Sequence, residues 1–198
     1  MEASYFTRHP RQKDAIGIAV FVLMVVIGTY LINSYIFRSF SVQGPSMETT
    51  LYTGDRLIVN RLAVTFKQLQ NQSYIPERGQ VIVFSNPNYV AGTDEEYLVK
   101  RVIGLPGDRV VVRDGVVKVY NAEHPDGWEI DRTLVGPGSP TSGEADKIVP
   151  ENHLFVIGDH RQGEYSLDSR NGLGLVPFYD VIGPVSYRIF PFNKIRGF

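Results

Sequence analysis

The apolar positions of the chain follow two patterns, which meet near residue 40. The first is one unbroken apolar run: Ala15–Leu31 carries no charge, and the uncharged stretch extends to Phe37. As a helix, the 23 residues from Ala15 to Phe37 would be about 34 Å long, which is enough to cross a hydrocarbon core with some tilt. The pattern therefore predicts one N-terminal transmembrane helix over residues 14–37.

The charges on either side of this run predict its orientation. Arg8, Arg11 and Lys13 precede the run and Arg38 follows it, so the positive excess places residues 1–13 in the cytoplasm. Residues 38–198 would then form an extracytoplasmic domain on a single-pass protein of the plasma membrane. The alternatives are a buried core helix and a cleaved signal peptide, but a secretory apolar region is shorter, at about 7–15 residues. The length favours an uncleaved anchor.

Beyond residue 40 the apolar residues come in short runs rich in Val, Ile, Tyr and Phe, separated by Gly, Pro and Asp. Such runs are typical of β-strands. Asp114-Gly115, between two valine-rich runs, predicts a hairpin. No later segment shows a sustained helical period. We expect a mainly β ectodomain of short antiparallel strands. The expected strands lie in RLIVNRLAV, GQVIVFSNP, YLVKRVIG, DRVVVRDG, VVKVYN, HLFVIGDH and DVIGPVSYRIF.

Two stretches are interpreted as loops. Residues 62–79 connect two expected strands and have room for a helical turn. Residues 116–152 are rich in Gly, Pro, Ser and acidic side chains after their first strand, and predict a peripheral, loop-rich excursion with one short strand in WEIDRTL. We interpret both as surface connections.

Composition argues against several classes of partner and of catalytic chemistry. The 20 basic and 21 acidic residues nearly cancel, which argues against a nucleic-acid partner. The absence of cysteine excludes disulfides, thiolate zinc sites and cysteine nucleophiles. The four histidines do not have the spacing of a ligand pair, so we expect no metal and no cofactor.

Lys100 has an unusual position in the run EYLVKRVIGLPGD. Side chains alternate between the two faces of a strand, so Lys100 and Arg101 point in opposite directions and at least one faces the covered side. Burial lowers the pKa of a lysine by as much as about 3–5 when it is complete, which makes the amine a competent general base. The alternative is an edge strand from which both charges reach water.

Ser46 lies in a Gly-Pro-Ser-Met turn. It is either an ordinary turn residue, whose hydroxyl bonds the backbone, or a nucleophile whose base comes from elsewhere in the chain. The sequence pattern alone does not establish contact between Ser46 and Lys100.

Taken together and in this order, several motifs behind an N-terminal span resemble the type I signal peptidases, which are membrane-bound serine proteases with a Ser-Lys dyad. The motifs are GPSMETTL, GDRLIVNR, RGQVIVF, YLVKRVIGLPGD and VIGDHRQGEYSLDSRNGLGLVP. The resemblance implies a signal-peptidase-like β fold for the ectodomain. It also implies that the substrates are exported preproteins with small residues before the cleavage site, and that membrane lipid is a partner.

The resemblance also implies roles for individual residues. Ser46 would be the nucleophile and Lys100 its general base. Ser166 would orient the lysine amine, and the ion pair of Asp168 and Arg170 would support the site. The expected substrate-binding residues are Phe40, Val42, Gly44, Leu51, Leu98 and Val99.

Four positions depart from the family pattern. Thr49 replaces a common proline, Gln80 an expected aspartate and His160 a usual asparagine. Gly44 occupies a position where some members supply a hydroxyl to the oxyanion hole, which leaves the second oxyanion donor open.

Two other functions compete with this interpretation. One is a self-cleaving or regulatory Ser-Lys peptidase, against which the apolar span and the balanced charge argue. The other is a non-enzymatic membrane-anchored β module, against which the presence of both Ser46 and Lys100 argues.

Overall fold

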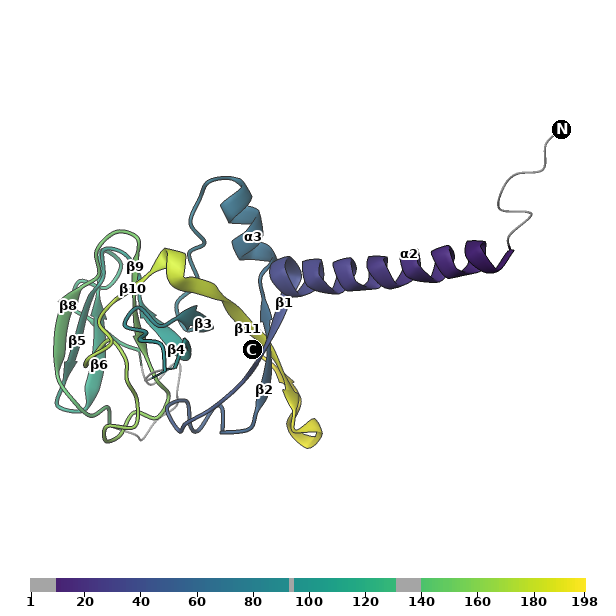
Figure 1. The fold of residues 1–198 in the computed structure, drawn as a ribbon. Helices are drawn as coiled ribbons and strands as arrows, with labels where there is room; N and C mark the ends of the chain where they lie inside the picture. The colour runs from purple at the N-terminus through teal and green to yellow at the C-terminus, as the bar shows by residue number, and fades with distance from the viewer. Residues whose placement is uncertain (1–9, 93–94, 131–139) are drawn as a thin grey trace.

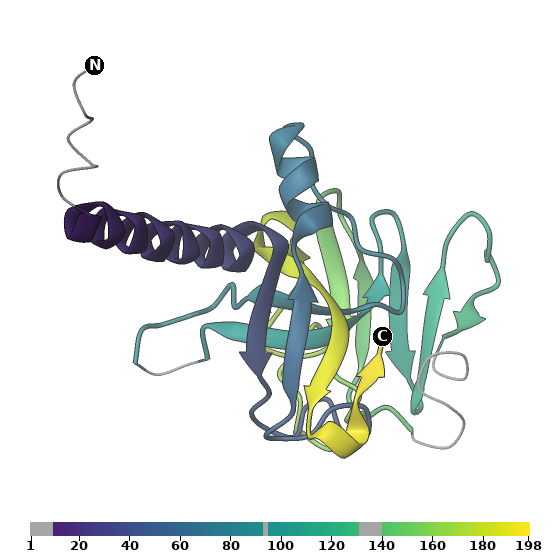
Figure 2. The same cartoon turned by 90° about the vertical axis from the view of Figure 1, so that its right-hand side faces the viewer.

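A single apolar helix projects from a body made of β-strands (Figures 1 and 2). The computed structural model describes residues 10–92, 95–130 and 140–198. Helix α2 spans Pro10–Leu31 and continues as a π-helical turn, η1, over Ile32–Ile36. Within the described residues, Asp14–Ile36 is the one helical segment long and apolar enough to cross a membrane, with 23 residues and a mean hydropathy of 2.7.

The predicted anchor ends one residue earlier than the sequence pattern suggests. Phe37 is uncharged, but it already belongs to strand β1 and pairs with Asn60. None of the anchor is buried inside the protein, so its apolar side chains are free to contact lipid.

The larger of two sheets carries the site and has eight strands in the order β1-β2-β11-β3-β4-β9-β10, with β12 paired to β11. Its described strand pairs are antiparallel, which confirms the predicted fold class. The strands are β1 (Phe37–Ser41), β2 (Arg56–Asn60), β3 (Val81–Ser85), β4 (Tyr97–Gly104), β9 (His153–Ile157), β10 (Val176–Pro177), β11 (Val181–Phe190) and β12 (Arg196–Gly197).

The second sheet has four strands in the order β7-β6-β5-β8. They are β5 (Arg109–Arg113), β6 (Val116–Tyr120), β7 (Trp128–Glu129) and β8 (Ala145–Ile148). The predicted hairpin joins β5 to β6, and Asp114 and Gly115 both have positive φ, at 53° and 80°, as the tight hairpin turn requires.

Residues 116–152 are thus more regular than expected. They supply three of the four strands of this sheet, and β8 lies in a part that we interpreted as loop. The sequence of β8, ADKI, is short and half polar because it is an edge strand with alternate side chains exposed. The strand expected in WEIDRTL is β7, and the rest of that segment beyond residue 130 lies outside the described residues.

The connection after β2 contains helix α3 (Leu62–Leu69), an eight-residue helix where we expected at most a turn. It buries only Val64, while its other large apolar side chains, Leu62, Phe66 and Leu69, are exposed. The hydroxyl of Thr65 donates to the carbonyl of Tyr35, which ties α3 to the end of the anchor. Two 3₁₀ turns, η2 (Phe178–Asp180) and η3 (Phe192–Lys194), flank β11.

Three apolar clusters stabilise the two sheets, and one of them fixes the segment after β1. In that cluster, Met47 and Leu51 are fully buried against Leu57 and Val59 of β2. Because Met47 directly follows Ser46, burial of its side chain determines where the Ser46 turn lies against the sheet.

Gly104 is the last residue of β4 and lies against Val110 of the second sheet. A Cβ at this position would be 2.6 Å from Val110 Cγ2 and 2.9 Å from Phe155 Cβ. We predict that Gly104→Ala lowers the free energy of unfolding by about 1–3 kcal/mol through overpacking, as measured by denaturant unfolding in detergent. Gly172→Ala is the control, because its Cβ would meet only Leu167 Cδ1 at 3.5 Å. Equal unfolding midpoints for the two variants would show that the packing around Gly104 has room for a methyl group.

Candidate active site

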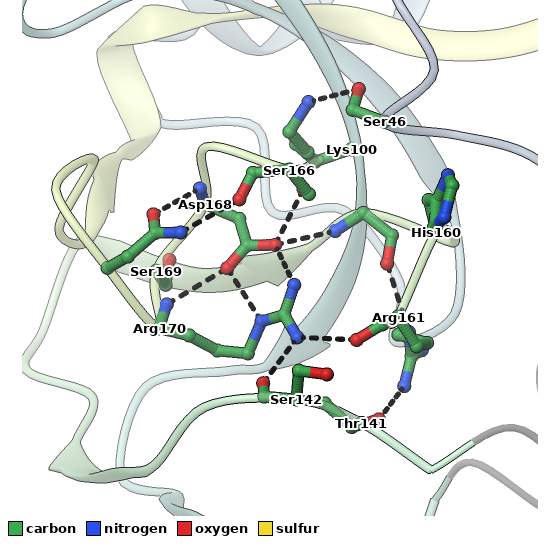
Figure 3. Close-up of polar contacts among 12 residues, drawn as sticks. Ser46, Lys100, Thr141, Ser142, His160, Arg161, Ser166, Asp168, Ser169 and Arg170 are labelled. Atoms are coloured by element: carbon green, nitrogen blue, oxygen red, sulfur yellow. Dashed lines mark hydrogen bonds and ion pairs between the residues drawn. The ribbon is translucent and has the colours of Figure 1, made fainter. Parts of the chain in front are cut away.

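The structure brings Ser46 and Lys100 into contact across 54 residues of sequence. Lys100 Nζ lies 2.7 Å from Ser46 Oγ (Figure 3). It donates a second hydrogen bond, of 3.0 Å, to the carbonyl of Val99. Only 2% of Lys100 is exposed. A serine hydroxyl therefore meets a primary amine that is almost completely removed from water.

The alternation of β4 explains how two adjacent charges fit in an apolar strand. Lys100 faces Ser46, and Arg101 faces the other side, where it forms an ion pair with Asp159 at 2.5 Å. The Arg101 side chain is only 11% exposed, so both faces of β4 are covered here. This confirms the expectation that at least one of the two charges points to a covered side, and it excludes the exposed edge-strand alternative.

Burial lowers the pKa of Lys100 from 10.5 to about 8. The cause is loss of hydration of the ammonium form. The negative charges of Asp168, Glu95 and Asp159 oppose this effect, and the positive charge of Arg170 adds to it. The net result is an amine with a substantial neutral fraction near neutral pH, as a general base requires.

Asp168 is the acidic residue with the largest influence on Lys100. It is fully buried and accepts hydrogen bonds from Ser166 Oγ at 2.7 Å, from Gly158 N at 3.1 Å and from the Arg170 guanidinium at 2.8 and 2.9 Å. Burial raises the pKa of Asp168, but the hydrogen bond and charge of Arg170 outweigh that effect and keep the pKa below its ordinary value. Asp168 is therefore an ionised carboxylate whose negative charge acts on Lys100.

Arg170 connects this carboxylate to two neighbouring segments. Its Nη1 donates to the carbonyls of Ser142, at 2.8 Å, and Arg161, at 3.1 Å (Figure 3). The expected pairing of Asp168 with Arg170 is present in the structure.

Ser166 lies close to the dyad, but its hydroxyl donates to Asp168 rather than to the lysine amine. Within the described residues, the hydrogen bonds of Lys100 Nζ go to Ser46 and Val99. That Ser166 orients the amine therefore stays a prediction.

Gly158 is a site residue that was not among those expected from the sequence. A Cβ at this position would overlap both Ser166 Oγ and the carbonyl oxygen of Ser46. The absence of a side chain thus lets the residue after β9 pass directly against the Ser46 turn. A glycine inside an apolar strand pattern, as in VIGDH, is the sequence signal for such a close backbone approach.

A cleft of about 260 Å³ opens beside the dyad. Four of the six expected substrate-binding residues line it: Phe40, Val42, Leu98 and Val99. Leu51 does not, because it is fully buried in the core behind the cleft. Gly44 also lies outside the lining, in the turn before Ser46, with a positive φ of 79°.

The cleft has further lining residues beyond the expected ones. They are Ser41, Gln43, Leu57, Val83, Glu95, Glu96 and Tyr97. Tyr97 packs edge to face on Phe40, with ring centroids 5.4 Å apart, and so links β4 to β1 at the rim. Among the described residues, no group of three or more His, Asp or Glu side chains is arranged to hold a metal ion.

A buried amine against a serine hydroxyl, on a mainly β scaffold, is the arrangement of Ser-Lys hydrolases. Residues 15–190 match the family described as signal peptidase, peptidase S26. The chain therefore belongs to the signal peptidase family, whose members are serine endopeptidases that cleave signal peptides.

Several relatives resemble the chain along most of its length. It is 34% identical to signal peptidase I of Bacillus licheniformis over 182 residues, which covers 88% of each chain. It is 32% identical to signal peptidase IB of Staphylococcus aureus (strain Mu50 / ATCC 700699) over 193 residues, covering 91% of this chain and 90% of the relative. The crystal structure of a signal peptidase I from Enterococcus faecalis V583 is 25% identical, with a TM-score of 0.42, and its match covers 58% of this chain and 100% of the other.

We predict that one lysine side chain titrates near pH 8, measured by NMR of the isotopically labelled lysine side chains in detergent. Its signal should be absent from Lys100→Met, which assigns it. In Asp168→Asn the pKa of Lys100 should fall further, because the largest negative charge that stabilises its ammonium form is removed. A Lys100 signal that titrates at the ordinary lysine value would contradict the effect of burial, and one that moves upward in Asp168→Asn would contradict the role of the Asp168 charge.

Proposed function

We propose that Ser46 is the nucleophile and Lys100 the general base with which this signal peptidase cleaves exported preproteins. The observation that carries the proposal is the 2.7 Å contact between Ser46 Oγ and Lys100 Nζ, at a lysine whose pKa is lowered to about 8. In the ammonium form Nζ donates to Oγ. In the neutral form the nitrogen lone pair is free to accept the hydroxyl proton.

Acylation then follows from this geometry. As Ser46 Oγ bonds to the scissile carbonyl carbon, its proton moves to Lys100 Nζ, and the carbonyl π electrons move to oxygen. When the tetrahedral intermediate collapses, the C–N bond breaks and Nζ gives the proton to the leaving amine. The signal peptide is left as an ester on Ser46, and Lys100 is neutral again.

Deacylation uses the same amine. Lys100 takes a proton from water while the water oxygen attacks the ester carbon, and it returns that proton to Ser46 Oγ as the C–O bond breaks. The backbone N–H of Ser46 supports both steps as an oxyanion donor. It donates to no other group within the described part of the chain, so it is available for the developing negative charge.

The cleft supports recognition of an extended peptide with small side chains before the cleavage site. Strand β4 pairs with β9 only from Arg101 onward, so the edge of Tyr97–Lys100 next to the cleft is open for a substrate strand. Residues one and three before the cut would face Phe40, Val42, Leu98 and Val99. Because a cleft of about 260 Å³ must hold several residues of the substrate, small substrate side chains fit better than large ones.

We further propose that residues 14–36 span the plasma membrane, that residues 1–13 are cytoplasmic and that residues 37–198 are the extracytoplasmic catalytic domain. The exposed apolar surface of α2 and the basic residues before it support this topology. It would place membrane lipid in contact with the chain and the site on the side to which preproteins are exported.

The balanced charge supports the absence of nucleic-acid partners, and the mechanism requires no cofactor.

The first test of the dyad is loss of cleavage. Ser46→Ala and Lys100→Met should each lower kcat/KM on a preprotein with an Ala-x-Ala site by at least about 10³-fold, because one removes the nucleophile and the other the base. The exposed residues Ser73 and Lys67 provide matched controls: Ser73→Ala and Lys67→Met should cleave at the wild-type rate. Wild-type turnover by Ser46→Ala or Lys100→Met would refute the assignment.

The topology is testable because the chain contains no cysteine. In intact cells a membrane-impermeant maleimide should label Ser73→Cys and leave Thr7→Cys unlabelled, and both should react after permeabilisation. The reverse labelling pattern in intact cells would show the opposite orientation.

A further inference from the structure

His160 contacts the nucleophile turn through its backbone and through its side chain. Its backbone N–H donates to the carbonyl of Ser46 at 3.1 Å, and its ring Nδ1 lies 3.2 Å from the carbonyl oxygen of Pro45. Figure 3 draws His160 on the segment between β9 and Arg161, beside Ser46. The two peptide groups on either side of the nucleophile are thus both held by one residue.

The Pro45 carbonyl is held by the His160 ring and by the Glu48 N–H, and its direction sets that of the Ser46 N–H. The carbonyl of Pro45 and the N–H of Ser46 belong to the same planar peptide, and because that peptide is trans they point in opposite directions. Any hydrogen bond that fixes the Pro45 oxygen therefore also fixes the Ser46 N–H. That N–H is the oxyanion donor of the proposed mechanism.

The surroundings of the imidazole fix its plane and favour the required tautomer. The ring stacks on Tyr165, with centroids 4.6 Å apart and an interplanar angle of 29°. The carboxylate of Glu48 lies 3.7 Å from Nδ1, which favours a proton on this nitrogen rather than on Nε2. Nδ1–H is then the donor to Pro45, whose oxygen has a second lone pair for the Glu48 N–H at 3.0 Å.

We propose that the imidazole of His160 is a positioning residue for the oxyanion hole. It acts through the Pro45–Ser46 peptide and touches neither the reacting hydroxyl nor the substrate, since His160 is not among the residues that line the cleft. Nothing in this role involves proton transfer, because Lys100 already occupies the position of the base. The inference rests on the proposed function of Ser46.

This role predicts a particular kinetic signature. A correctly directed N–H matters when the carbonyl oxygen gains charge, so loss of the ring donor should lower kcat and leave KM unchanged. Removal of an oxyanion donor costs about 10²–10³ in kcat, and misdirection of one that remains should cost less, about 10- to 100-fold. The side-chain variants retain the backbone bonds from His160 N to Ser46 O and from Glu48 N to Pro45 O, so they isolate the ring contact.

The variants are His160→Phe, which keeps an aromatic ring on Tyr165 without a donor, and His160→Asn. The amide nitrogen of asparagine is attached to Cγ, as Nδ1 is in histidine, so Asn can place a donor at the same point. We expect His160→Phe to lose about 10- to 100-fold in kcat with KM within about twofold, and His160→Asn to stay within about threefold of wild type. His124→Phe is the matched control, because His124 also lies against an aromatic ring, that of Trp128, in the second sheet.

A peptide aldehyde gives a second readout, because its adduct with Ser46 carries an oxygen in the position of the oxyanion. Its inhibition constant should rise in His160→Phe by the same factor as kcat falls. If His160→Phe does not fold, His160→Gln replaces it, since its donor is one bond further from the backbone. Wild-type kcat in His160→Phe or His160→Gln, or an equal loss in His160→Asn, would overturn the proposal. These outcomes are distinct from failure of the proposed function, which would appear as wild-type cleavage by Ser46→Ala or Lys100→Met.

Discussion

The site depends on keeping the amine of Lys100 out of water and against the hydroxyl of Ser46. A pKa displaced from 10.5 to about 8 corresponds to about 3 kcal/mol of unfavourable free energy for the charged form in the folded protein. Below pH 8 the lysine is protonated in both the folded and the unfolded chain, so the fold carries this penalty in full. The penalty decreases as the pH rises from 8, because the folded protein then loses the proton while the unfolded chain retains it until about 10.5. At neutral pH the catalytic arrangement is therefore maintained at a cost in stability.

Two of the three carboxylates that raise the pKa of Lys100 are held in ion pairs, so their charges do not cancel the effect of burial. The charge of Asp168 is shared with Arg170, and that of Asp159 with Arg101. These ion pairs are almost completely buried, so removing one partner would leave an uncompensated charge. They also join separate segments: Arg101 connects β4 to the loop after β9, and Arg170 reaches from its own loop to the carbonyl of Ser142. The same ion pairs thus limit how far the carboxylates stabilise the ammonium form of Lys100, and they fix the segments around it.

Local patterns predict the fold class, the anchor, most of the strands and the β5–β6 hairpin, because alternation, length and turn residues are properties of adjacent positions. Local patterns do not predict the contact between Ser46 and Lys100. Lys100 is recognisable as an anomaly in its strand, but its contact with Ser46 depends on the packing of Met47 and on the close approach of Gly158, which involve segments far apart in sequence. The resemblance to a family supplied that pairing, and the geometry agrees with it.

Leu51 illustrates the limit of transferring roles by resemblance. It is apolar and near Ser46, yet it packs behind the cleft, because the turn after Ser46 directs its side chain into the cluster with Met47. Tyr97 shows the converse. It lies in an expected strand, but only the non-local approach of β4 to β1 brings its ring to the rim of the cleft. Tertiary pairing of the strands sets which residues face the substrate. The order of residues along the chain does not contain this information.

The link between the anchor and the site is a strand rather than a flexible linker. β1 starts at Phe37, directly after η1, pairs with β2 along its whole length and ends at Ser41, where the cleft begins. Arg61 N donates to the carbonyl of Ile36 and the Thr65 hydroxyl to that of Tyr35, so the end of the helix is also bonded to the α3 segment. From Ile36 to Ser46 the chain extends at most about 36 Å, and the paired strand removes most of its freedom. With α2 in a bilayer, the distance of the dyad from the membrane would be a property of the fold, and a peptide emerging from the membrane would meet the site only over a narrow range of its length.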